Sequence, residues 1–380
     1  MTRPAILVAG GGTGGHVFPA VAVAEAMQAM ADVDVVFCGT ARGVEARVVP
    51  ARGWRLELVD VEPMKGGGAR RAVRGAYVAA KAMARAVHVV RSVRPRAVLS
   101  VGGYAAGPVT LAGALLGVPV ALLEPNNVVG LANRLLGPFA RRAYVAWDET
   151  GARFRASARR TYGVPLRAGF GPRPYAARGT RRVLVLGGSQ GAAALNERMP
   201  QAVARLGDVK DVEVTHQAGR DRDGSVRAAY EAAGVARVTV VPFIDDVAGA
   251  LADADLVVAR SGAGSVAELT AVGRAAILVP FPHAADDHQA RNAEALARTG
   301  GALCLRQEVA DPGRLAREIA RLLLDDAART AMADASRACG KPGAARDVAA
   351  DLLALAGITQ RPRSATNGAT RGALGSEEAH

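Results

Sequence analysis

Two glycine-rich turns constrain the fold of this chain more than any other feature. The first, GGGTGGH, covers residues 10–16, and the second, GGSQGA, covers residues 187–192. Each turn follows a short apolar run and precedes an alanine-rich stretch, so each predicts a strand, a turn of the size that holds a phosphate, and a helix. We therefore expect two similar domains that face one ligand.

The rest of the chain favours a two-domain α/β fold. Its 380 residues, half of them apolar, exceed what one core usually covers. Strands and helices alternate at the spacing of βαβ units, which predicts a doubly wound parallel sheet in each half, with ligands at the carboxyl ends of the strands. The expected strands are 5–9, 33–37, 97–101 and 118–123 in the first half, and 182–186, 212–216, 238–241, 256–259 and 276–279 in the second.

Composition suggests where the domains begin and end. The segment 162–174 holds three prolines and is the natural linker, and the polar segment 358–380 lacks periodicity and is expected to be a disordered tail. The expected order is a domain at 1–163, a linker at 164–174, a domain at 175–357 and the tail at 358–380.

Cysteine usage and the amino terminus indicate a cytoplasmic protein. Cys38, Cys304 and Cys339 are too few and too scattered for a disulfide framework or a metal cluster. The first apolar run is too short for the core of a signal peptide. The uncharged segment 97–123 is long enough to span a bilayer, but its five glycines and two prolines favour a strand, a loop, a helix at 109–116 and a strand.

Positive charge is concentrated in the first half of the chain. The net charge is +13, and residues 1–165 hold 21 Lys and Arg against 10 Asp and Glu. A predicted helix there is basic and amphipathic, and such a helix either rests on anionic lipid or is a solvated face of an arginine-rich protein. Nucleic acid binding is disfavoured, since aromatic residues make up only 4% of the chain. The basic face holds Arg70, Arg74, Lys81, Arg85 and His88, and the neighbouring apolar face holds Val73, Ala80, Met83 and Val87.

The first turn also fits the dinucleotide pattern G-x-G-x-x-G, through Gly10, Gly12 and Gly15. That pattern is weak alone and needs an acidic residue at the end of the second strand, where it binds a ribose. In this chain the second strand ends FCGT, at residues 37–40. A nicotinamide cofactor is therefore disfavoured.

The second half carries a denser set of polar residues at strand ends and helix starts. The Ser-Gly-rich stretch 260–265 opens a helix whose backbone N–H groups suit a diphosphate, and Glu268, one turn further on, can accept from two ribose hydroxyls. One such turn alone would be an ordinary helix start, with Glu268 a common first-turn acid. Several turns at successive strand ends predict a nucleoside diphosphate site.

Together these motifs resemble the MurG family of peptidoglycan glycosyltransferases, the inverting enzymes of glycosyltransferase family 28. The resemblance runs from about residue 5 to residue 355 and implies a GT-B fold, two Rossmann-like domains across a cleft, whose last helix packs back on the amino-terminal domain. It implies transfer of N-acetylglucosamine from UDP-GlcNAc to the 4-hydroxyl of lipid I, which gives lipid II. The motifs are GGGTGGHVFPA at 10–20, GGY at 102–104, EPN at 124–126, GGSQGA at 187–192, FIDD at 243–246, RSGAGSVAE at 260–268 and PFPHAADDHQ at 280–289.

The resemblance also implies roles for single residues. Ile244 would contact uracil through its backbone, Glu268 the ribose hydroxyls, and Arg167 the nucleotide. The lipid-linked acceptor would bind through Gly103 and Tyr104. The diphosphate is expected to contact Ser189, Ser261, Gly262 and Ser265, and the sugar and leaving phosphate are expected to contact Thr13, Gly14, Gly15, His16, Asn126, His288 and Gln289.

The implied reaction is an inverting transfer that needs a base near the acceptor hydroxyl and positive partial charge near the departing diphosphate. His16 is the candidate base, although it could instead only bind the diphosphate or orient the acceptor. We expect no cofactor and no metal, because helix N-termini and arginines can neutralise the diphosphate. Two positions depart from the family pattern: Pro125 replaces a common glutamine and stiffens its loop, and His288 replaces another.

The resemblance favours the lipid interpretation of the basic helix, because a polyprenyl-linked acceptor stays in the bilayer. We expect a peripheral protein on the cytoplasmic face of the bacterial inner membrane, bound to anionic inner-leaflet lipid, with cell-wall synthesis and division proteins as further partners. The alternatives are another GT-B enzyme that uses UDP-GlcNAc, on a different lipid acceptor or as an epimerase, and a catalytically silent nucleotide-sugar-binding module. The expected membrane contacts are Arg70, Arg74, Lys81, Arg85, Leu115 and Leu116.

Overall fold

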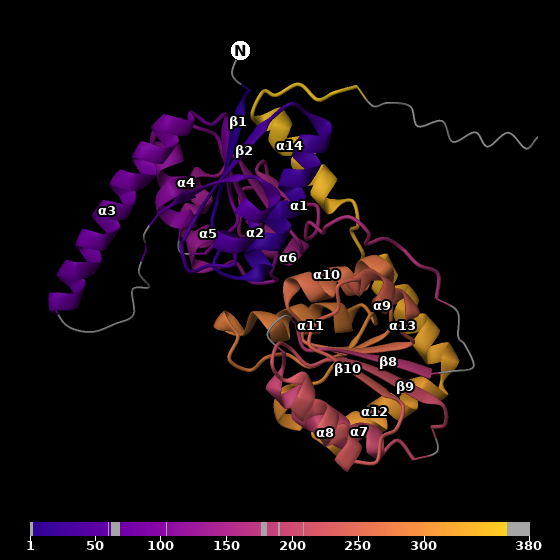
Figure 1. The fold of residues 1–380 in the computed structure, drawn as a ribbon. Helices are drawn as coiled ribbons and strands as arrows, with labels where there is room; N and C mark the ends of the chain where they lie inside the picture. The colour runs from indigo at the N-terminus through magenta and orange to yellow at the C-terminus, as the bar shows by residue number, and fades with distance from the viewer. Residues whose placement is uncertain are drawn as a thin grey trace, which may run out of the picture.

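The structure is a computed structural model that describes residues 3–59, 61, 69–103, 105–175, 181–188, 191–207 and 209–362. The chain forms two α/β domains, each built on one parallel sheet (Figure 1). The amino-terminal domain is coloured indigo to magenta, and most of the carboxyl-terminal domain is rose to orange. This confirms the prediction of two parallel-sheet domains.

The amino-terminal sheet has seven strands in the order β3-β2-β1-β4-β5-β6-β7. The chain runs outward from β1 in one direction and then outward from β4 in the other. The loops that follow β1 and β4 therefore meet at the carboxyl edge, where ligands of such sheets bind. The strands are β1 (Ala5–Ala9), β2 (Asp34–Gly39), β3 (Arg55–Leu58), β4 (Ala97–Ser100), β5 (Val120–Glu124), β6 (Arg142–Val145) and β7 (Arg159–Thr161).

The carboxyl-terminal sheet repeats this plan with six strands in the order β10-β9-β8-β11-β12-β13. Its winding reverses between β8 and β11, so the loops after these two strands are the ones that meet at the carboxyl edge. The strands are β8 (Arg181–Leu186), β9 (Val212–Gln217), β10 (Val238–Val241), β11 (Leu256–Ala259), β12 (Ala276–Leu278) and β13 (Leu303–Cys304).

Helices cover both faces of each sheet (Figure 1). Three of them begin at an aspartate that accepts a hydrogen bond from a backbone N–H three residues on: Asp246 caps α9, Asp311 caps α12 and Asp325 caps α13. The helices of the first domain are α1 (Gly14–Met30), α2 (Glu45–Val48), α3 (Ala69–Val93), α4 (Ala106–Leu115), α5 (Leu131–Leu136) and α6 (Asp148–Gly151), with short η1 (Pro50–Arg52) and η2 (Gly137–Phe139). The later ones are α7 (Ala193–Ala204), α8 (Asp223–Ala232), α9 (Val247–Asp253), α10 (Ala263–Val272), α11 (His288–Arg298), α12 (Pro312–Leu324), α13 (Asp326–Ala338) and α14 (Ala344–Leu355), with short η3 (Ala285–Asp287) and η4 (Gln307–Val309).

The central strands are apolar on both faces because both faces are covered. In β1, Ile6 and Val8 join one core cluster, and Leu7 and Ala9 join the cluster on the opposite face. This is the period-two alternation of a strand buried between two helical layers. The carboxyl-terminal sheet likewise separates two clusters.

The last helix, α14, returns to the amino-terminal domain, as Figure 1 shows in yellow. Val348, Leu352 and Leu353 are fully buried in the core cluster that also contains residues of α1. The Asp351 carboxylate accepts hydrogen bonds from Arg142 Nε at 2.8 Å and from the Tyr144 hydroxyl at 2.9 Å. Apolar packing and a half-buried polar cluster therefore fix α14 to this domain.

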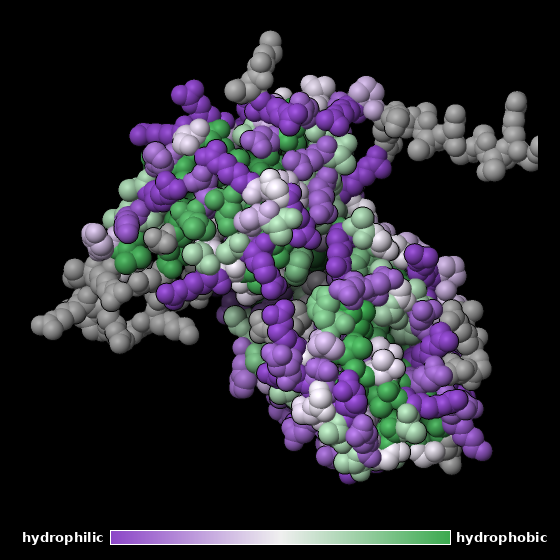
Figure 2. Space-filling model, viewed as in Figure 1, coloured by the Kyte–Doolittle hydropathy of each residue, from purple (hydrophilic) through white to green (hydrophobic). Residues whose placement is uncertain are grey.

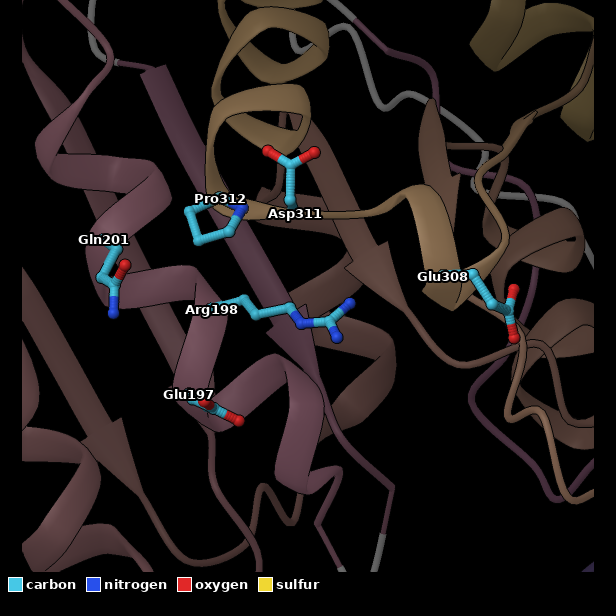
Figure 3. A pocket seen from close by; sticks show the side chains of 6 residues that line it. All are labelled: Glu197, Arg198, Gln201, Glu308, Asp311 and Pro312. Atoms are coloured by element: carbon cyan, nitrogen blue, oxygen red, sulfur yellow. The ribbon is translucent and has the colours of Figure 1, made fainter.

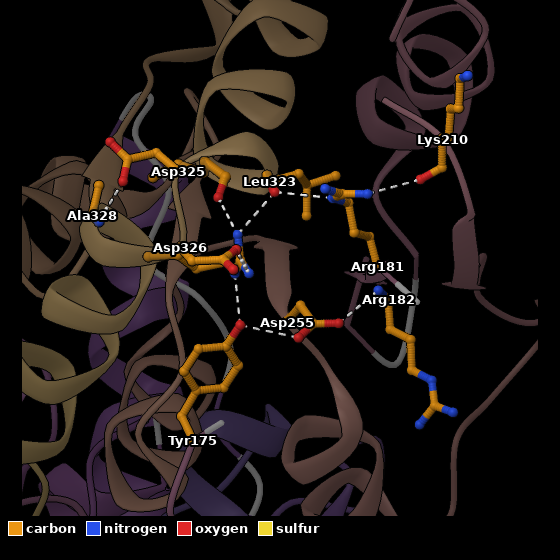
Figure 4. A network of polar contacts seen from close by, with 11 residues as sticks. Tyr175, Arg181, Arg182, Lys210, Asp255, Leu323, Asp325, Asp326 and Ala328 are labelled. Carbon is orange, nitrogen blue, oxygen red and sulfur yellow. Dashed lines mark hydrogen bonds and ion pairs between the residues drawn. The ribbon is translucent and has the colours of Figure 1, made fainter. Parts of the chain in front are cut away.

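A polar network anchors the chain where it enters the second domain (Figure 4). The Tyr175 hydroxyl donates to Asp255 Oδ1 at 3.0 Å and accepts from Arg329 Nε at 2.6 Å. The other Asp255 oxygen accepts from the backbone N–H of Arg182 at the start of β8, at 2.8 Å. Arg329 is only 1% exposed and also binds Asp326 and two carbonyls at the end of α12. Buried arginine is costly unless its donors are bonded, and four hydrogen bonds to this guanidinium offset that cost.

Several sequence expectations need correction. Four strands lie outside the sequence prediction: β3, β6, β7 and β13. They are only two to four residues long, and three of them contain arginine, so they lack the apolar run that identifies a buried strand. The helix α3 is present, and Met83 and Val87 of its expected apolar face pack against a core cluster, but Ala80 is exposed. The fully buried residues of α3 are Ala82, Ala86, Val89 and Val90. The side chain of Val73 and most of the expected tail lie outside the described residues.

The uncharged segment 97–123 folds as expected, into β4, α4 and the start of β5. Within the described residues, no helix combines the length and the apolar character needed to cross a membrane. The domain boundaries at 163, 174 and 357 stay predictions.

Candidate active site

The buried carboxylate of Glu45, at the start of α2, binds the backbone of the first glycine turn. Glu45 is 1% exposed, and its Oε2 accepts from the Gly12 N–H at 2.7 Å. Its Oε1 accepts from both the N–H and the hydroxyl of Thr40, at 2.9 and 3.0 Å. A Cβ on Gly11 would lie 2.3 Å from the Glu45 carboxyl carbon, so only glycine fits there. The carboxylate fixes the turn in one shape.

A second turn, which contains the GGY motif, packs directly on the first. The Gly11 N–H donates to the Gly102 carbonyl at 3.2 Å. Gly103 has φ +87°, and a Cβ there would approach the Gly11 carbonyl oxygen to 2.4 Å. The expected acceptor residue Gly103 thus lies against the first turn, and its neighbour Tyr104 lies outside the described residues. Backbone contact at this distance explains why both turns are glycine-rich.

His16 lies in the first turn of α1, between these two glycine turns. Its Nδ1 is 3.3 Å from Thr13 Oγ1, and Nε2 would be 3.2 Å from a Cβ on Gly102. Burial lowers the pKa of His16 below its usual 6.5, and the Gly11 carbonyl only partly offsets this. The imidazole is therefore neutral at physiological pH, the form that can accept a proton.

Asn126 follows β5 on a loop held by a second buried carboxylate. Glu124 is 3% exposed, and its oxygens accept from the Asn126 N–H at 3.2 Å, the Gly130 N–H at 2.8 Å and Asn133 Nδ2 at 3.0 Å. Burial raises the pKa of Glu124, although these hydrogen bonds favour its ionised form. The EPN motif thus builds a rigid loop.

One buried amide joins this loop to the other domain. Asn292 of α11 is 0% exposed. Its Oδ1 accepts from the Asn127 N–H at 2.8 Å, and its Nδ2 donates to Asn126 Oδ1 at 3.3 Å and to the Ser261 carbonyl at 3.2 Å. Asn292 therefore couples a sugar-contact candidate in one domain to the expected diphosphate loop in the other. Sequence reasoning missed it, and nothing in the local pattern singles it out.

On the donor side, the loop after β11 leads into α10. Gly262 is the N-cap of this helix, and Gly262 and Ser265 are half-exposed. Among the residues that the structure describes, no side chain caps the first N–H groups of α10, which leaves them able to bind an anion. Ser261 is 0% exposed, and its hydroxyl donates to the Gln289 carbonyl at 2.8 Å, so its contact with the diphosphate stays a prediction. This hydrogen bond fixes the loop to the first turn of α11.

Glu268 lies in α10 with Arg167 of the expected linker beside it. Burial raises the pKa of Glu268 to about 7, and the charge of Arg167 partly opposes this rise. Arg167 is exposed, and its guanidinium carbon is 5.6 Å from the centre of the Phe170 ring. The structure thus brings together two residues that the sequence assigns to the nucleotide.

Arg260 supports the donor loop from within the domain. Its guanidinium donates to the carbonyls of Val279 and Pro280, both at 3.0 Å, and to Gln307 Oε1 at 2.7 Å. The carbonyl of Gln307 accepts in turn from Arg198, which points between α7 and η4 into a hollow of about 290 Å³ (Figure 3). Of the expected site residues that the structure describes, none lines that hollow.

His288 and Gln289 begin α11 after a turn in which Asp286 and Asp287 both have positive φ. His288 Nδ1 donates to the Ala285 carbonyl at 2.7 Å. In the neutral ring this places the proton on Nδ1 and makes Nε2 a hydrogen-bond acceptor. A charge on His288 lowers the pKa of His16, so the two rings, from different domains, lie within electrostatic reach. Gln289 Oε1 accepts from the Phe281 N–H at 3.1 Å, which orients its amide.

The other expected residues are placed as follows. Thr13 is the N-cap of α1, and Gly14 and Gly15 form its first turn beside His16. Ile244 is half-buried on the loop between β10 and α9. Ser189 lies outside the described residues, and so do the side chains of Arg70 and Arg74. Within the described part of the chain, no group of three or more His, Cys, Asp or Glu is placed to hold a metal ion. That the reaction needs no metal stays a prediction.

The expected membrane residues lie on the amino-terminal domain. Lys81 and Arg85 are exposed on α3, but Arg85 donates to Glu57 Oε2 at 2.8 Å and is partly neutralised there. At the end of α4, Leu115 is 68% exposed and Leu116 is 38% exposed. In Figure 2, hydrophobic residues reach the surface around α3 and α4, among hydrophilic ones.

Comparison with known proteins agrees with this architecture. Residues 6–145 match the glycosyltransferase family 28 N-terminal domain, and residues 182–349 match the family 28 C-terminal domain. A relative from Sorangium cellulosum is 55% identical over 92% of this chain and 88% of its own length. It is named UDP-N-acetylglucosamine–N-acetylmuramyl-(pentapeptide) pyrophosphoryl-undecaprenol N-acetylglucosamine transferase.

Solved structures give the same result. The crystal structure of Acinetobacter baumannii MurG is similar with a TM-score of 0.78 and 34% identity, over 92% of this chain and 99% of that one. A UDP-GlcNAc 2-epimerase from Neisseria meningitidis has a TM-score of 0.64 over 92% of this chain and all of its own, but at 11% identity it shows only a common fold. The GT-B fold is confirmed. The chain therefore belongs to the MurG family of glycosyltransferase family 28.

Proposed function

We propose that this protein transfers N-acetylglucosamine from UDP-GlcNAc to the muramoyl 4-hydroxyl of lipid I, with inversion, and releases lipid II and UDP. The observation that carries this proposal is the neutral His16 between two glycine turns, opposite the donor loop and α10 of the other domain. The first domain thus offers a surface for the acceptor, and the second domain offers a surface for the donor. The relative from Sorangium cellulosum carries this activity in its name.

The chain's own residues supply the steps. His16 takes the proton from the 4-hydroxyl as its oxygen bonds to the anomeric carbon, and the bond from that carbon to the UDP oxygen breaks. The uncapped N–H groups at the start of α10 stabilise the charge that develops on the diphosphate. Glu268 and Arg167 hold the nucleoside, and Asn126 and Gln289 orient the sugar.

The deciding experiment is transfer of labelled GlcNAc from UDP-GlcNAc to a soluble lipid I analogue. We expect a product that carries the label and one UDP released per transfer. UDP-GlcNAc bound without transfer would instead favour a silent binding module. Conversion of UDP-GlcNAc without any acceptor would favour an epimerase, the activity named for the Neisseria meningitidis structure.

Donor affinity should depend on pH through Glu268. Its pKa is about 7 in the free protein, and only the carboxylate can accept from both ribose hydroxyls. As pH falls from 8 to 6, the neutral form becomes dominant, so the KM for UDP-GlcNAc should rise by about tenfold. The measurement is KM across this pH range. Glu268→Gln should have a high KM that stays flat with pH, and the same slope in that variant would assign the titration to another group.

We further propose that the protein binds the bilayer peripherally through the amino-terminal domain. The segment between Glu62 and Glu124 holds nine Lys and Arg and no carboxylate. Leu115 and Leu116 are exposed at the end of α4, which packs on α5, where Leu131 and Leu135 are each 65% exposed. Apolar side chains beside basic ones suit an anionic lipid surface. We place this contact on the cytoplasmic face of the inner membrane, the face that the resemblance to the MurG family implies.

Liposome sedimentation tests the membrane contact. The wild-type protein should sediment with anionic vesicles at moderate salt, and Leu115→Gln with Leu116→Gln should weaken binding by about thirtyfold, since each leucine loses about 1 kcal/mol of apolar transfer energy. Leu324→Gln is the matched control, because Leu324 is 55% exposed on α12 of the other domain. Wild-type protein that stays in the supernatant would overturn the proposal.

A further inference from the structure

A pocket of about 630 Å³ adjoins the candidate active site on the side of α5, α6 and α11. Its walls carry Arg134, Arg153 and Arg155 from the first domain and Arg291 from α11 of the second. In Figure 1, α6 lies at the edge of the first domain that faces the second, and the hydrogen bonds of Asn292 place α11 against the first domain. This volume lies within the range of small-molecule sites and could take several residues of a peptide.

The charge in this pocket is positive and mostly unneutralised. Glu149 lines the pocket, but its carboxylate is 3.4 Å from the guanidinium of Arg298. Arg298 is not part of the lining, so this carboxylate is already paired with a cation from outside the pocket. Arg134 is 3.8 Å from Asp286 and donates to the Val129 carbonyl. Over the described residues, the side chains of Arg153, Arg155 and Arg291 make no ion pair or hydrogen bond. Guanidinium groups bind carboxylates with two parallel hydrogen bonds, so they suit a ligand with carboxylates.

The pocket shares a wall with the residues expected to hold the reacting sugar. Asn127, which follows Asn126, is part of the lining, and the hydroxyl of Thr150 in the lining donates to the Asn126 carbonyl at 3.1 Å. Arg291 precedes Asn292, which binds both Asn126 and Asn127. A group attached next to the reacting hydroxyl therefore has a short path into the pocket.

We infer that this pocket binds the carboxylates of the peptide carried by the acceptor, an inference that rests on the proposed function. The muramyl pentapeptide is joined through its amino end, so its terminal carboxylate lies at the far end. The peptide branches from the carbon beside the reacting 4-hydroxyl and, fully extended, reaches about 17 Å over five residues. An anionic lipid headgroup suits the site less well, because the arginines line a concavity between two domains instead of a convex outer face.

The experiment compares two soluble short-chain acceptors without vesicles, one with the native pentapeptide and one with its carboxylates converted to amides. Wild-type enzyme should lose about tenfold or more in kcat/KM on amidation, because each charged pair contributes a factor of this size. The double variant Arg153→Gln with Arg291→Gln should use both acceptors about equally, at the lower value. Its KM for UDP-GlcNAc should be unchanged. Arg346→Gln, at an exposed position of α14, is the matched control and should behave as wild type.

Other outcomes have distinct meanings. Equal kcat/KM for the two acceptors with the wild-type enzyme would overturn the inference and leave the proposed function intact. The same would follow if the double variant lost activity equally on both acceptors. In a separate sedimentation measurement with anionic vesicles, a double variant that lost vesicle binding but kept the wild-type preference for the native acceptor would assign the pocket to lipid headgroups and would also overturn the inference. No transfer to either acceptor by the wild-type enzyme would overturn the proposed function itself.

Discussion

His16→Ala should lower kcat by about 10²-fold or more, because general-base catalysis typically contributes 10² to 10⁴. The side chain lies between two glycine turns, and its pKa is lowered by burial, so it is neutral and able to accept a proton at pH 7. The measurement is kcat with saturating UDP-GlcNAc and acceptor. The wild-type profile should lose activity as pH falls through the His16 pKa, below 6.5, and the variant should lack that limb.

Two checks separate base catalysis from a structural role of His16. The affinity of His16→Ala for UDP-GlcNAc should stay within a few-fold of wild type, because a base acts mainly on the transition state. His88→Ala, which removes an exposed histidine of α3, should leave kcat unchanged. A drop in kcat below about tenfold would mean that His16 binds or orients, and that the base is another group.

Glu45→Ala should destabilise the amino-terminal domain and impair turnover together. The substitution removes three hydrogen bonds to a carboxylate, from the Gly12 N–H and from the N–H and hydroxyl of Thr40, and bonds to charged groups contribute about 1.5–3 kcal/mol each when buried and less here, where the donors are only partly buried. The free energy of unfolding should fall by about 3 kcal/mol, and kcat should fall by about tenfold because the turn beside His16 is no longer fixed. Thermal unfolding and steady-state kinetics measure the two effects.

Glu45→Gln keeps the shape of the side chain and one acceptor oxygen, so it should recover part of both losses. Glu25→Ala is the control in the same domain, since the exposed Glu25–Arg52 pair at 3.4 Å contributes at most about 1 kcal/mol. If Glu45→Ala unfolded like wild type, the carboxylate would not hold the turn. If it were destabilised but turned over normally, its role would be confined to stability.

The sequence predicts those parts of this protein whose signal is local. The turns at 10–16 and 102–104 are recognised because glycine is required where backbone meets backbone, as at Gly10 and Gly103. The central strands are recognised because both of their faces are apolar. The strands β3 and β7 are missed because they are short and charged at the edges of a sheet, where burial leaves no periodic pattern.

Contacts between distant segments are what the sequence cannot supply. Glu45 meets Gly12 across 33 positions, and Asn292 meets Asn126 across 166 positions. Neither Glu45 nor Asn292 departs from the pattern of its neighbours in the sequence, so the sequence does not identify either as a site residue. The burial of Ser261 likewise depends on a distant segment, α11. The sequence predicts that Ser261 contacts the ligand, whereas in the structure its hydroxyl binds the Gln289 carbonyl of α11.

The return of α14 to the amino-terminal domain means that this domain is not one continuous stretch of sequence. A fragment that ended in the linker would lack Val348, Leu352 and Leu353 and would expose the apolar side of α1 that they cover. It would also leave the Tyr144 hydroxyl without Asp351. Two segments of chain therefore connect the domains, one in each direction. Opening of the cleft is consequently limited to movements in which both connections bend together, and a hinge at the linker alone does not describe it.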